Sequence, residues 1–215
     1  SYPQPYHGCY WLENKGDWNF DFQRIAAFGG TYAAAVGDLD NDSDLDVVLA
    51  SMLGDGTDDS PSLVWCENDG SQQFRTWRID SRPAHLVTVA ARDLDGDGLP
   101  EIVAKSAFGG LVAFEWNGSA FVRRWFSTRM DGSRDMIGGS SAIPSLSMAD
   151  LDDDGRPEIL MGGVTYSPDG LLLDEALGLH PVASYSQPPV TADLDHDGDA
   201  GPPTGQGASP SRIPL

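Results

Sequence analysis

The chain is poor in cysteine, in basic residues and in long apolar runs. It has 2 Cys among 215 residues, and 13 Lys and Arg against 33 Asp and Glu. No apolar run reaches the roughly 18 residues that suggest a membrane-spanning helix, so none is predicted. The few basic residues form no cluster, which argues against nucleic acid or an anionic membrane as a partner.

The two cysteines, Cys9 and Cys66, occupy non-equivalent places in two similar segments. A disulfide between them is an open alternative, but nothing in the sequence supports it. We favour two separate buried thiols. The cysteines by themselves do not decide between a reducing and an oxidising compartment.

The sequence also lacks a recognisable catalytic constellation. No serine lies in a nucleophile-elbow sequence. The scattered histidines are expected to have surface or packing roles rather than catalytic ones. They are His7, His85, His180 and His196. We therefore predict no catalytic residues and no cofactor-binding residues other than metal ligands, and we do not expect the chain by itself to be an enzyme.

What the chain has in abundance is aspartate, arranged as four copies of Asp-Leu-Asp-x-Asp. The full loops read DLDNDSDLD (38–46), DLDGDGLPE (93–101), DLDDDGRPE (150–158) and DLDHDGDAG (193–201). Carboxylates stand at loop positions 1, 3 and 5 in all four loops, and an acid stands at position 9 in the first three. A set of solvated acidic turns is the alternative, but unpaired carboxylates about 4 Å apart repel by roughly 1 to 4 kcal/mol. A bound dication would turn that repulsion into attraction.

In a tight turn these alternate side chains converge on one point. Position 6, usually Gly, lets the backbone bend so that the carbonyl of position 7 also points inward. An all-oxygen cage in a flexible loop suits Ca²⁺ better than Mg²⁺, and zinc is disfavoured because neither Cys nor His clusters there. We predict three Ca²⁺ sites and leave a fourth open, because Gly201 replaces the acid in the last loop. The predicted metal ligands are Asp38, Asp40, Asp42, Asp44, Asp46, Asp93, Asp95, Asp97, Leu99, Glu101, Asp150, Asp152, Asp154, Arg156, Glu158, Asp193, Asp195, Asp197 and Asp199.

An EF-hand is the nearest competing motif, but it needs a bidentate Glu at position 12 and helices on both sides. Position 12 is Leu49, Ala104, Met161 or Thr204 here, and none of these side chains can coordinate a metal. The flanking segments are short, apolar and bounded by Gly, Pro, Asn and Asp, which is typical of strands. We therefore place each loop at the tip of a β-hairpin.

The loops recur at intervals of roughly 40 to 60 residues, which is in the range of propeller blades. Four strand candidates in each unit match the four-stranded antiparallel blade. The segment at 10–25 resembles the last two strands of a unit, so the chain is expected to open in mid-blade. The expected division is a partial blade (1–30), three blades (31–84, 85–144 and 145–188), the start of a further blade (189–200) and a disordered tail (201–215).

The segment FGGTYAAAVGDLDNDSDLDVVLA (28–50) resembles the FG-GAP or VCBS repeats of integrin-like calcium-binding propellers. Phe28, Gly29 and Gly30 stand where the Phe-Gly signature of that family would lie. The resemblance implies an all-β fold, a β-propeller built of four-stranded antiparallel blades with Ca²⁺ in the hairpin between the first two strands of a blade. With about three full blades plus partial ones, the propeller is expected to be partial and the chain to be a piece of a longer protein.

The resemblance implies a secreted or cell-surface module that acts in protein or glycan binding or adhesion. The alternative, from another class, is the propeller portion of an extracellular polysaccharide lyase or glycoside hydrolase, and a structural spacer is a third. Most tryptophans are expected to pack between blades, although some could stack on sugars. The irregular connection 127–143 is the best candidate for a ligand-contacting loop.

Overall fold

The computed structural model describes residues 7–107, 110–127, 146–161 and 164–173, and this part of the chain consists of strands and turns without a helix. The strands are β1 (Cys9–Gly16), β2 (Asn19–Ala26), β3 (Thr31–Gly37), β4 (Asp46–Ser51), β5 (Leu63–Asn68), β6 (Phe74–Asp80), β7 (Leu86–Arg92), β8 (Glu101–Ser106), β9 (Leu111–Trp116), β10 (Phe121–Ser127), β11 (Leu146–Ala149), β12 (Glu158–Met161) and β13 (Val164–Tyr166). The described residues include no helix that is long and apolar enough to cross a membrane.

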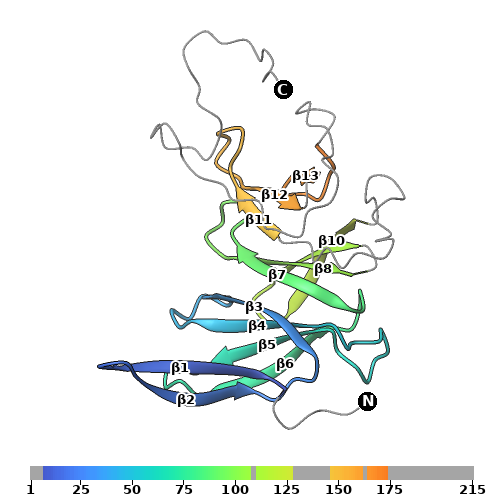
Figure 1. Cartoon of the computed structure of the whole chain (residues 1–215). Helices are drawn as coiled ribbons and strands as arrows, with labels where there is room; N and C mark the ends of the chain where they lie inside the picture. The colour runs from blue at the N-terminus through green and yellow to red at the C-terminus, as the bar shows by residue number, and fades with distance from the viewer. Residues whose placement is uncertain (1–6, 108–109, 128–145, 162–163, 174–215) are drawn as a thin grey trace, which may run out of the picture.

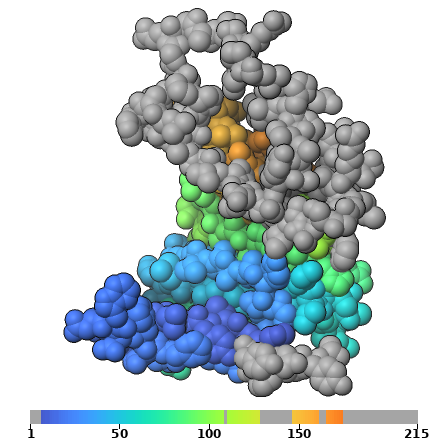
Figure 2. Space-filling model, in the orientation of Figure 1, coloured from blue at the N-terminus to red at the C-terminus, as the bar shows by residue number. Residues whose placement is uncertain are grey.

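Each strand pairs antiparallel with the next strand of the same sheet. The sheets are β1-β2, β3-β4-β5-β6, β7-β8-β9-β10 and β11-β12-β13. They are stacked in chain order, from the N-terminal hairpin at the bottom of Figure 1 to β11–β13 near the top, and Figure 2 shows the same succession on the surface. This confirms the predicted all-β class with four-stranded antiparallel blades.

The first strand of each full sheet contacts the first strand of the next. β7 lies against β3 on one side and against β11 on the other. This is how the inner strands of neighbouring blades meet in a propeller. The sheets in the described ranges form an open row, as expected for a partial propeller.

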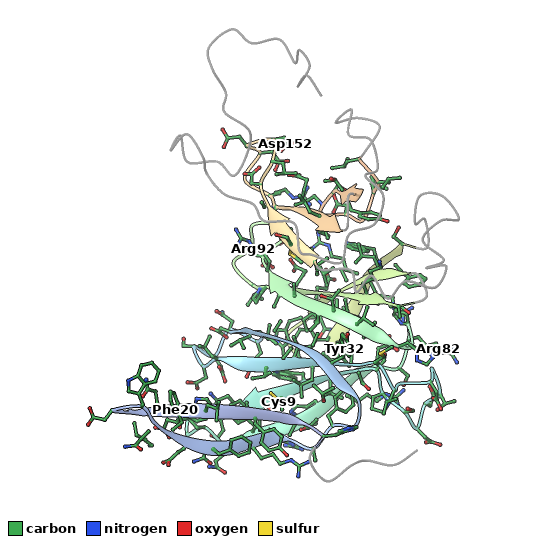
Figure 3. All side chains as sticks on the ribbon, viewed as in Figure 1. Cys9, Phe20, Tyr32, Arg82, Arg92 and Asp152 are labelled. Atoms are coloured by element: carbon green, nitrogen blue, oxygen red, sulfur yellow. The ribbon has the colours of Figure 1, made fainter. Side chains whose placement is uncertain are left out.

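The central strands of each sheet are apolar on both faces because both faces are covered. Along β4, Val48 and Ala50 join the cluster that β3–β6 shares with β7–β10, whereas Val47 and Leu49 face the N-terminal hairpin. Successive side chains of a strand point to opposite faces, so one strand supplies two cores. Fully burying a Val or Leu side chain contributes about 1.5–3 kcal/mol. Side chains from successive sheets fill the space between them (Figure 3).

The β9 strand shows the same division one sheet further along the chain. Val112 and Phe114 belong to the cluster shared with β3–β6, and Leu111 and Ala113 to the cluster shared with β11–β13. This explains why these strands appear in the sequence as continuous apolar runs rather than as the alternating pattern of a sheet with one wet face.

The N-terminal hairpin β1-β2 packs on the outer face of the first full sheet. Cys9 and Cys66 both belong to the apolar cluster of this interface, and both are free thiols. Only Cys66 is fully buried, and Cys9 is half-buried. Burial raises the pKa of the Cys66 thiol to about 11, which keeps it protonated at neutral pH.

Several predicted features lie outside the described residues. These are the fourth acidic loop with Asp193, Asp195, Asp197 and Asp199, the terminal segment 201–215, and all of the proposed ligand-contacting connection except Ser127.

Candidate metal-binding loops

Three of the four acidic loops lie in the described part of the chain, and each connects the first and second strands of a sheet. Residues 38–45 join β3 to β4, residues 93–100 join β7 to β8, and residues 150–157 join β11 to β12. The hairpins therefore form where the sequence predicts them. The alternating acids of each loop are presented at the tip of a hairpin whose two strands fix its ends.

The first aspartate of each loop organises the backbone. In the second loop the Asp93 carboxylate accepts hydrogen bonds from the backbone N–H groups of Gly96, at 2.7 Å, and Gly98, at 2.9 Å. Burial by itself raises the pKa of Asp93, but these N–H groups outweigh it and bring the pKa below its ordinary value. Asp38 and Asp150 accept the equivalent bond from position 6 in the first and third loops, and their second bond comes from position 5 instead of position 4.

Two positions of each loop adopt positive φ. At position 6, φ is 75° for Ser43, 91° for Gly98 and 85° for Gly155. Position 4 is also left-handed, at 68° for Asn41 and 62° for Asp153. Glycine adopts this conformation without steric cost, and Asn and Asp tolerate it better than other residues. The first loop keeps the same turn although Ser43, which adopts this conformation less readily, replaces glycine.

The acid at position 9 of the loop accepts a hydrogen bond from the loop backbone. Glu101 is buried and its Oε2 accepts a hydrogen bond of 2.8 Å from the backbone N–H of Leu94, at position 2. Glu158 makes the same bond to Leu151 at 2.7 Å. The side chain of Leu94 is fully buried between sheets. The leucine that recurs at position 2 thus fixes the loop in the core, a role that the sequence alone did not assign.

The carboxylates of each loop converge. One oxygen from each member of three groups lies within 4.8 Å of the others in its group, so each group can hold a metal ion. The groups are Asp38, Asp40 and Asp42; Asp93, Asp95 and Glu101; and Asp150, Asp152 and Glu158. The donors are all carboxylate oxygens, which fit a hard divalent cation. One further observation supports the fit: Asp40 Oδ1 is buried and has no hydrogen-bond partner in the structure.

Not every predicted ligand joins these groups. Asp46, at position 9 of the first loop, is not a member, and its oxygens accept the backbone N–H groups of Asn68 at 2.8 Å and Leu39 at 3.4 Å. The position 5 acids Asp97 and Asp154 accept the backbone N–H of position 7, at 2.8 Å in both loops. These bonds hold the turn at Leu99, Arg156 and, in the first loop, Asp44, whose N–H donates to Asp42 at 2.9 Å.

Burial and mutual repulsion shift the pKa values of the carboxyl groups in these loops. Burial, together with the smaller effect of the nearby Asp46 and Asp42 carboxylates, raises the pKa of Asp40 to about 6. Burial also raises the pKa of Glu101 to about 7, against the lowering effect of the Leu94 N–H. The pKa values of Asp46 and Glu158 are raised, mainly by burial. The surroundings of these carboxyl groups therefore favour either their protonated form or a bound cation that compensates their negative charge.

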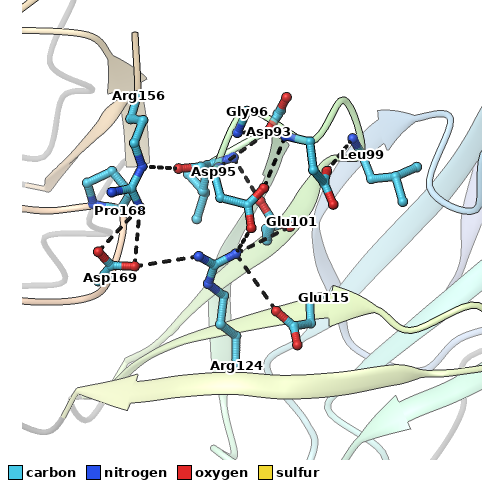
Figure 4. Close-up of polar contacts among 12 residues, drawn as sticks. Asp93, Asp95, Gly96, Leu99, Glu101, Glu115, Arg124, Arg156, Pro168 and Asp169 are labelled. Atoms are coloured by element: carbon cyan, nitrogen blue, oxygen red, sulfur yellow. Dashed lines mark hydrogen bonds and ion pairs between the residues drawn. The ribbon is translucent and has the colours of Figure 1, made fainter. Parts of the chain in front are cut away.

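A cationic network missed by the sequence analysis surrounds the second loop (Figure 4). The Arg124 guanidinium, on β10, pairs with Asp95 at 2.5 Å and lies 3.7 Å from Glu101. Its other nitrogen reaches Asp169, which also pairs with Arg156 at 3.2 Å. Arg156 donates from Nε to the carbonyl of Leu94. The side chain of a third-loop residue thus holds the second loop, and only folding brings the two together.

The raised pKa of Glu101 predicts how the demetallated protein responds to pH. The folded state binds this proton with a pKa of about 7, above the ordinary value of 4.5. The stability from this proton is full below 4.5 and is lost as the pH rises through 7. Demetallated protein is therefore expected to melt several degrees higher at about pH 5.5 than at about pH 8. Calorimetry in chelator-treated buffers measures this, and equal melting temperatures would contradict it.

Comparison with known proteins finds a repeat family that matches the part of the chain with the first two loops. Residues 38–104 match the model of the FG-GAP-like repeat. Cartilage acidic protein 1 of Mus musculus is 28% identical over 160 residues, which cover 66% of this chain and 24% of that protein. The chain thus spans about a quarter of the length of this curated relative.

Two solved structures are also similar. A lectin of Agrocybe aegerita, described as recognising non-reducing terminal N-acetylglucosamine, has a TM-score of 0.50 at 16% identity and covers 77% of this chain and 45% of that one. A rhamnogalacturonan lyase of Bacillus licheniformis has a TM-score of 0.45 at 19% identity and covers 65% and 30%. The chain spans less than half of either structure, and the likeness to the lectin is one of fold.

Proposed function

Because the chain contains an FG-GAP-like repeat at residues 38–104, we propose that it is a calcium-binding propeller segment whose acidic hairpins each hold one Ca²⁺ ion. The observation that carries the proposal is the convergence of three carboxylate oxygens within 4.8 Å in each of three loops. Ca²⁺ takes six to eight oxygen ligands in flexible geometry, whereas Mg²⁺ demands a near-ideal octahedron. The carbonyls of position 7 at Asp44, Leu99 and Arg156 would add one backbone oxygen to each ligand set.

The charge of the chain supports the same proposal. The formal net charge is −20, and the acidic loops concentrate it on hairpin tips. Like charges held at about 4 Å repel by roughly 1 kcal/mol in water and about 4 kcal/mol near a protein surface. Without an ion, the carboxylates of a loop therefore destabilise the turn that brings them together. A dication removes this repulsion and links the two strands of the hairpin. The ion's role is structural: it favours the folded hairpin by mass action.

Isothermal titration calorimetry of the demetallated chain with CaCl₂ tests the proposal. We expect at least three ions to bind per chain, with a fourth if the loop at 193–201 also forms a site. An Asp95→Ala chain is expected to bind one ion fewer, because Asp95 belongs only to the second group. MgCl₂ serves as the matched titrant and is expected to bind more weakly, since Mg²⁺ dehydrates reluctantly. A wild-type titration without Ca²⁺ uptake would sink the proposal.

We propose for the same module a role in protein or glycan binding or adhesion outside the cell. Calcium-dependent folding is effective where Ca²⁺ is plentiful, and the mouse relative carries cartilage in its name. The lectin with the similar fold is described as binding a sugar, which supports a glycan as one ligand class. Turnover of a pectic polymer by the purified chain would instead favour the polysaccharide-degrading alternative.

A further inference from the structure

The second acidic loop differs from the first and the third in the cation that lies beside it. The Nη1 atom of Arg124 lies 2.5 Å from Asp95 and 3.7 Å from Glu101, and both acids belong to the second metal group. No member of the first or third group takes part in an ion pair between residues that the structure describes. Within this part of the chain, the second loop alone shares its carboxylates with a guanidinium (Figure 4).

The third loop contains an arginine of its own, but the side chain of that arginine is engaged elsewhere. Arg156 donates from Nε to the carbonyl of Leu94 and pairs with Asp169 at 3.2 Å. It therefore makes its contacts with the second loop and with the turn after β13 rather than with the carboxylates of the third group.

A β-bulge accompanies Arg124 in its strand. In the ladder of β9 and β10, Arg123 and Trp125 lie opposite consecutive residues of β9, so Arg124 is the extra residue. Bulges commonly change the direction of a side chain next to a functional site. The register shift in the ladder of β5 and β6 lies instead at Leu63 and Val64. The position of this bulge is therefore a feature of the second sheet that the first sheet does not share.

Acids outside the metal groups keep the guanidinium beside the loop. Arg124 lies 3.8 Å from Glu115 and 3.5 Å from Asp169, and neither acid belongs to a metal group. These two acids continue to attract the guanidinium when an ion neutralises Asp95 and Glu101. The positive charge of Arg124 therefore stays near the loop after an ion binds.

A calcium ion and Arg124 would draw on the same two negative charges. Like charges repel, and a dication is repelled twice as strongly as a monovalent cation at the same distance. The side chain of Arg124 is only 17% exposed, so salt and water screen this repulsion less than they would at an open surface.

We infer that Arg124 sets the calcium affinity of the second loop by competing with the ion for Asp95 and Glu101. The second site is then weaker than its own carboxylates would make it. The inference rests on the calcium binding proposed above and adds a residue from outside the acidic motif that adjusts one site. Arg124 lies 29 residues from Asp95 in the sequence, so the motif does not reveal it.

The test follows one backbone amide in each loop in ¹H–¹⁵N spectra while CaCl₂ is added to the demetallated full chain. The amides are those of Ser43, Gly98 and Gly155, because each donates to the first aspartate of its own loop. The midpoint of each signal is the CaCl₂ concentration at which half of its change is complete. In Arg124→Gln we expect the Gly98 midpoint to fall about tenfold because one repelling charge is removed. The Ser43 and Gly155 midpoints should stay unchanged.

Matched variants separate the charge of Arg124 from its packing. Arg124→Lys keeps the positive charge and should leave the Gly98 midpoint close to the wild-type value. Arg123→Gln makes the same chemical change at the next residue, which pairs with Asp80 at 2.6 Å, outside the metal groups. It should leave all three midpoints unchanged. Melting curves verify that each variant folds cooperatively, and Arg124→Met replaces Arg124→Gln if that variant does not.

The outcomes distinguish this inference from the proposed calcium binding. A Gly98 midpoint that is unchanged or higher in the chain without the Arg124 charge would overturn the inference, as would an equal fall in Arg123→Gln. In either case a saturable response of the three amides would leave the proposed calcium binding intact. No response of any amide to CaCl₂ would overturn the calcium binding and the inference together.

Discussion

Removal of calcium is expected to lower the melting temperature of this protein by roughly 15–30 °C when the ion was present at about a hundred times its dissociation constant. At that ratio each site contributes about 2.7 kcal/mol, and three sites contribute about 8 kcal/mol. For a chain of this size, 1 kcal/mol corresponds to about 2–4 °C. The physical cause is that each of the three loops holds three carboxylate oxygens within 4.8 Å of one another, whether or not an ion neutralises them.

Differential scanning calorimetry with and without EDTA measures this shift. The matched control adds MgCl₂ in excess of the EDTA, which should restore only part of the lost stability because the oxygen cages suit the larger ion. Restoration by CaCl₂ should be complete. Identical melting curves before and after chelation would show that the loops do not depend on a metal, and the structural role proposed for calcium would then be wrong.

Glu101→Gln is expected to change stability in opposite directions with and without calcium. In the demetallated protein at about pH 8 the variant should melt higher than the wild type, because it removes a buried charge whose pKa burial raises to about 7. The amide oxygen of glutamine can still accept the Leu94 N–H. With calcium the variant should melt roughly 5–10 °C lower, because about 2.7 kcal/mol from one site is lost.

Glu115→Gln provides the matched control for this substitution. Glu115 also lies by Arg124, at 3.8 Å, but it is not a member of a metal group. The same chemical change there should leave both the ion count and the calcium-dependent part of the melting temperature unchanged. Ion counts come from calorimetric titration of both variants. An unaltered ion count in the Glu101→Gln variant would show that this carboxylate is not a ligand of the second site.

The second loop shows what the local sequence can predict about the site. The spacing of Asp93, Asp95 and Glu101 predicted that their side chains converge, and the structure places oxygens of all three within 4.8 Å. The first loop shows the limit. Its position 9 acid, Asp46, obeys the same spacing, yet the backbone N–H of Asn68 on β5 binds it at 2.8 Å and Asp42 takes its place in the group. Asn68 lies 22 residues from Asp46 in the sequence, so the spacing of the motif does not reveal this hydrogen bond.

The sequence by itself determined the strands and the acidic hairpins, because both depend on contacts between residues close in the chain. Alternating side chains, left-handed positions such as Ser43 and Gly98, and carboxylates two residues apart are local features. Only the tertiary structure decided which side chains meet between sheets. Arg124 lies 45 residues from Asp169, and the cavity between the two four-stranded sheets joins Asp40 to Phe121, so no spacing in the sequence encodes them. Their positions follow from the stacking of sheets, which depends on burying both faces of the central strands at once.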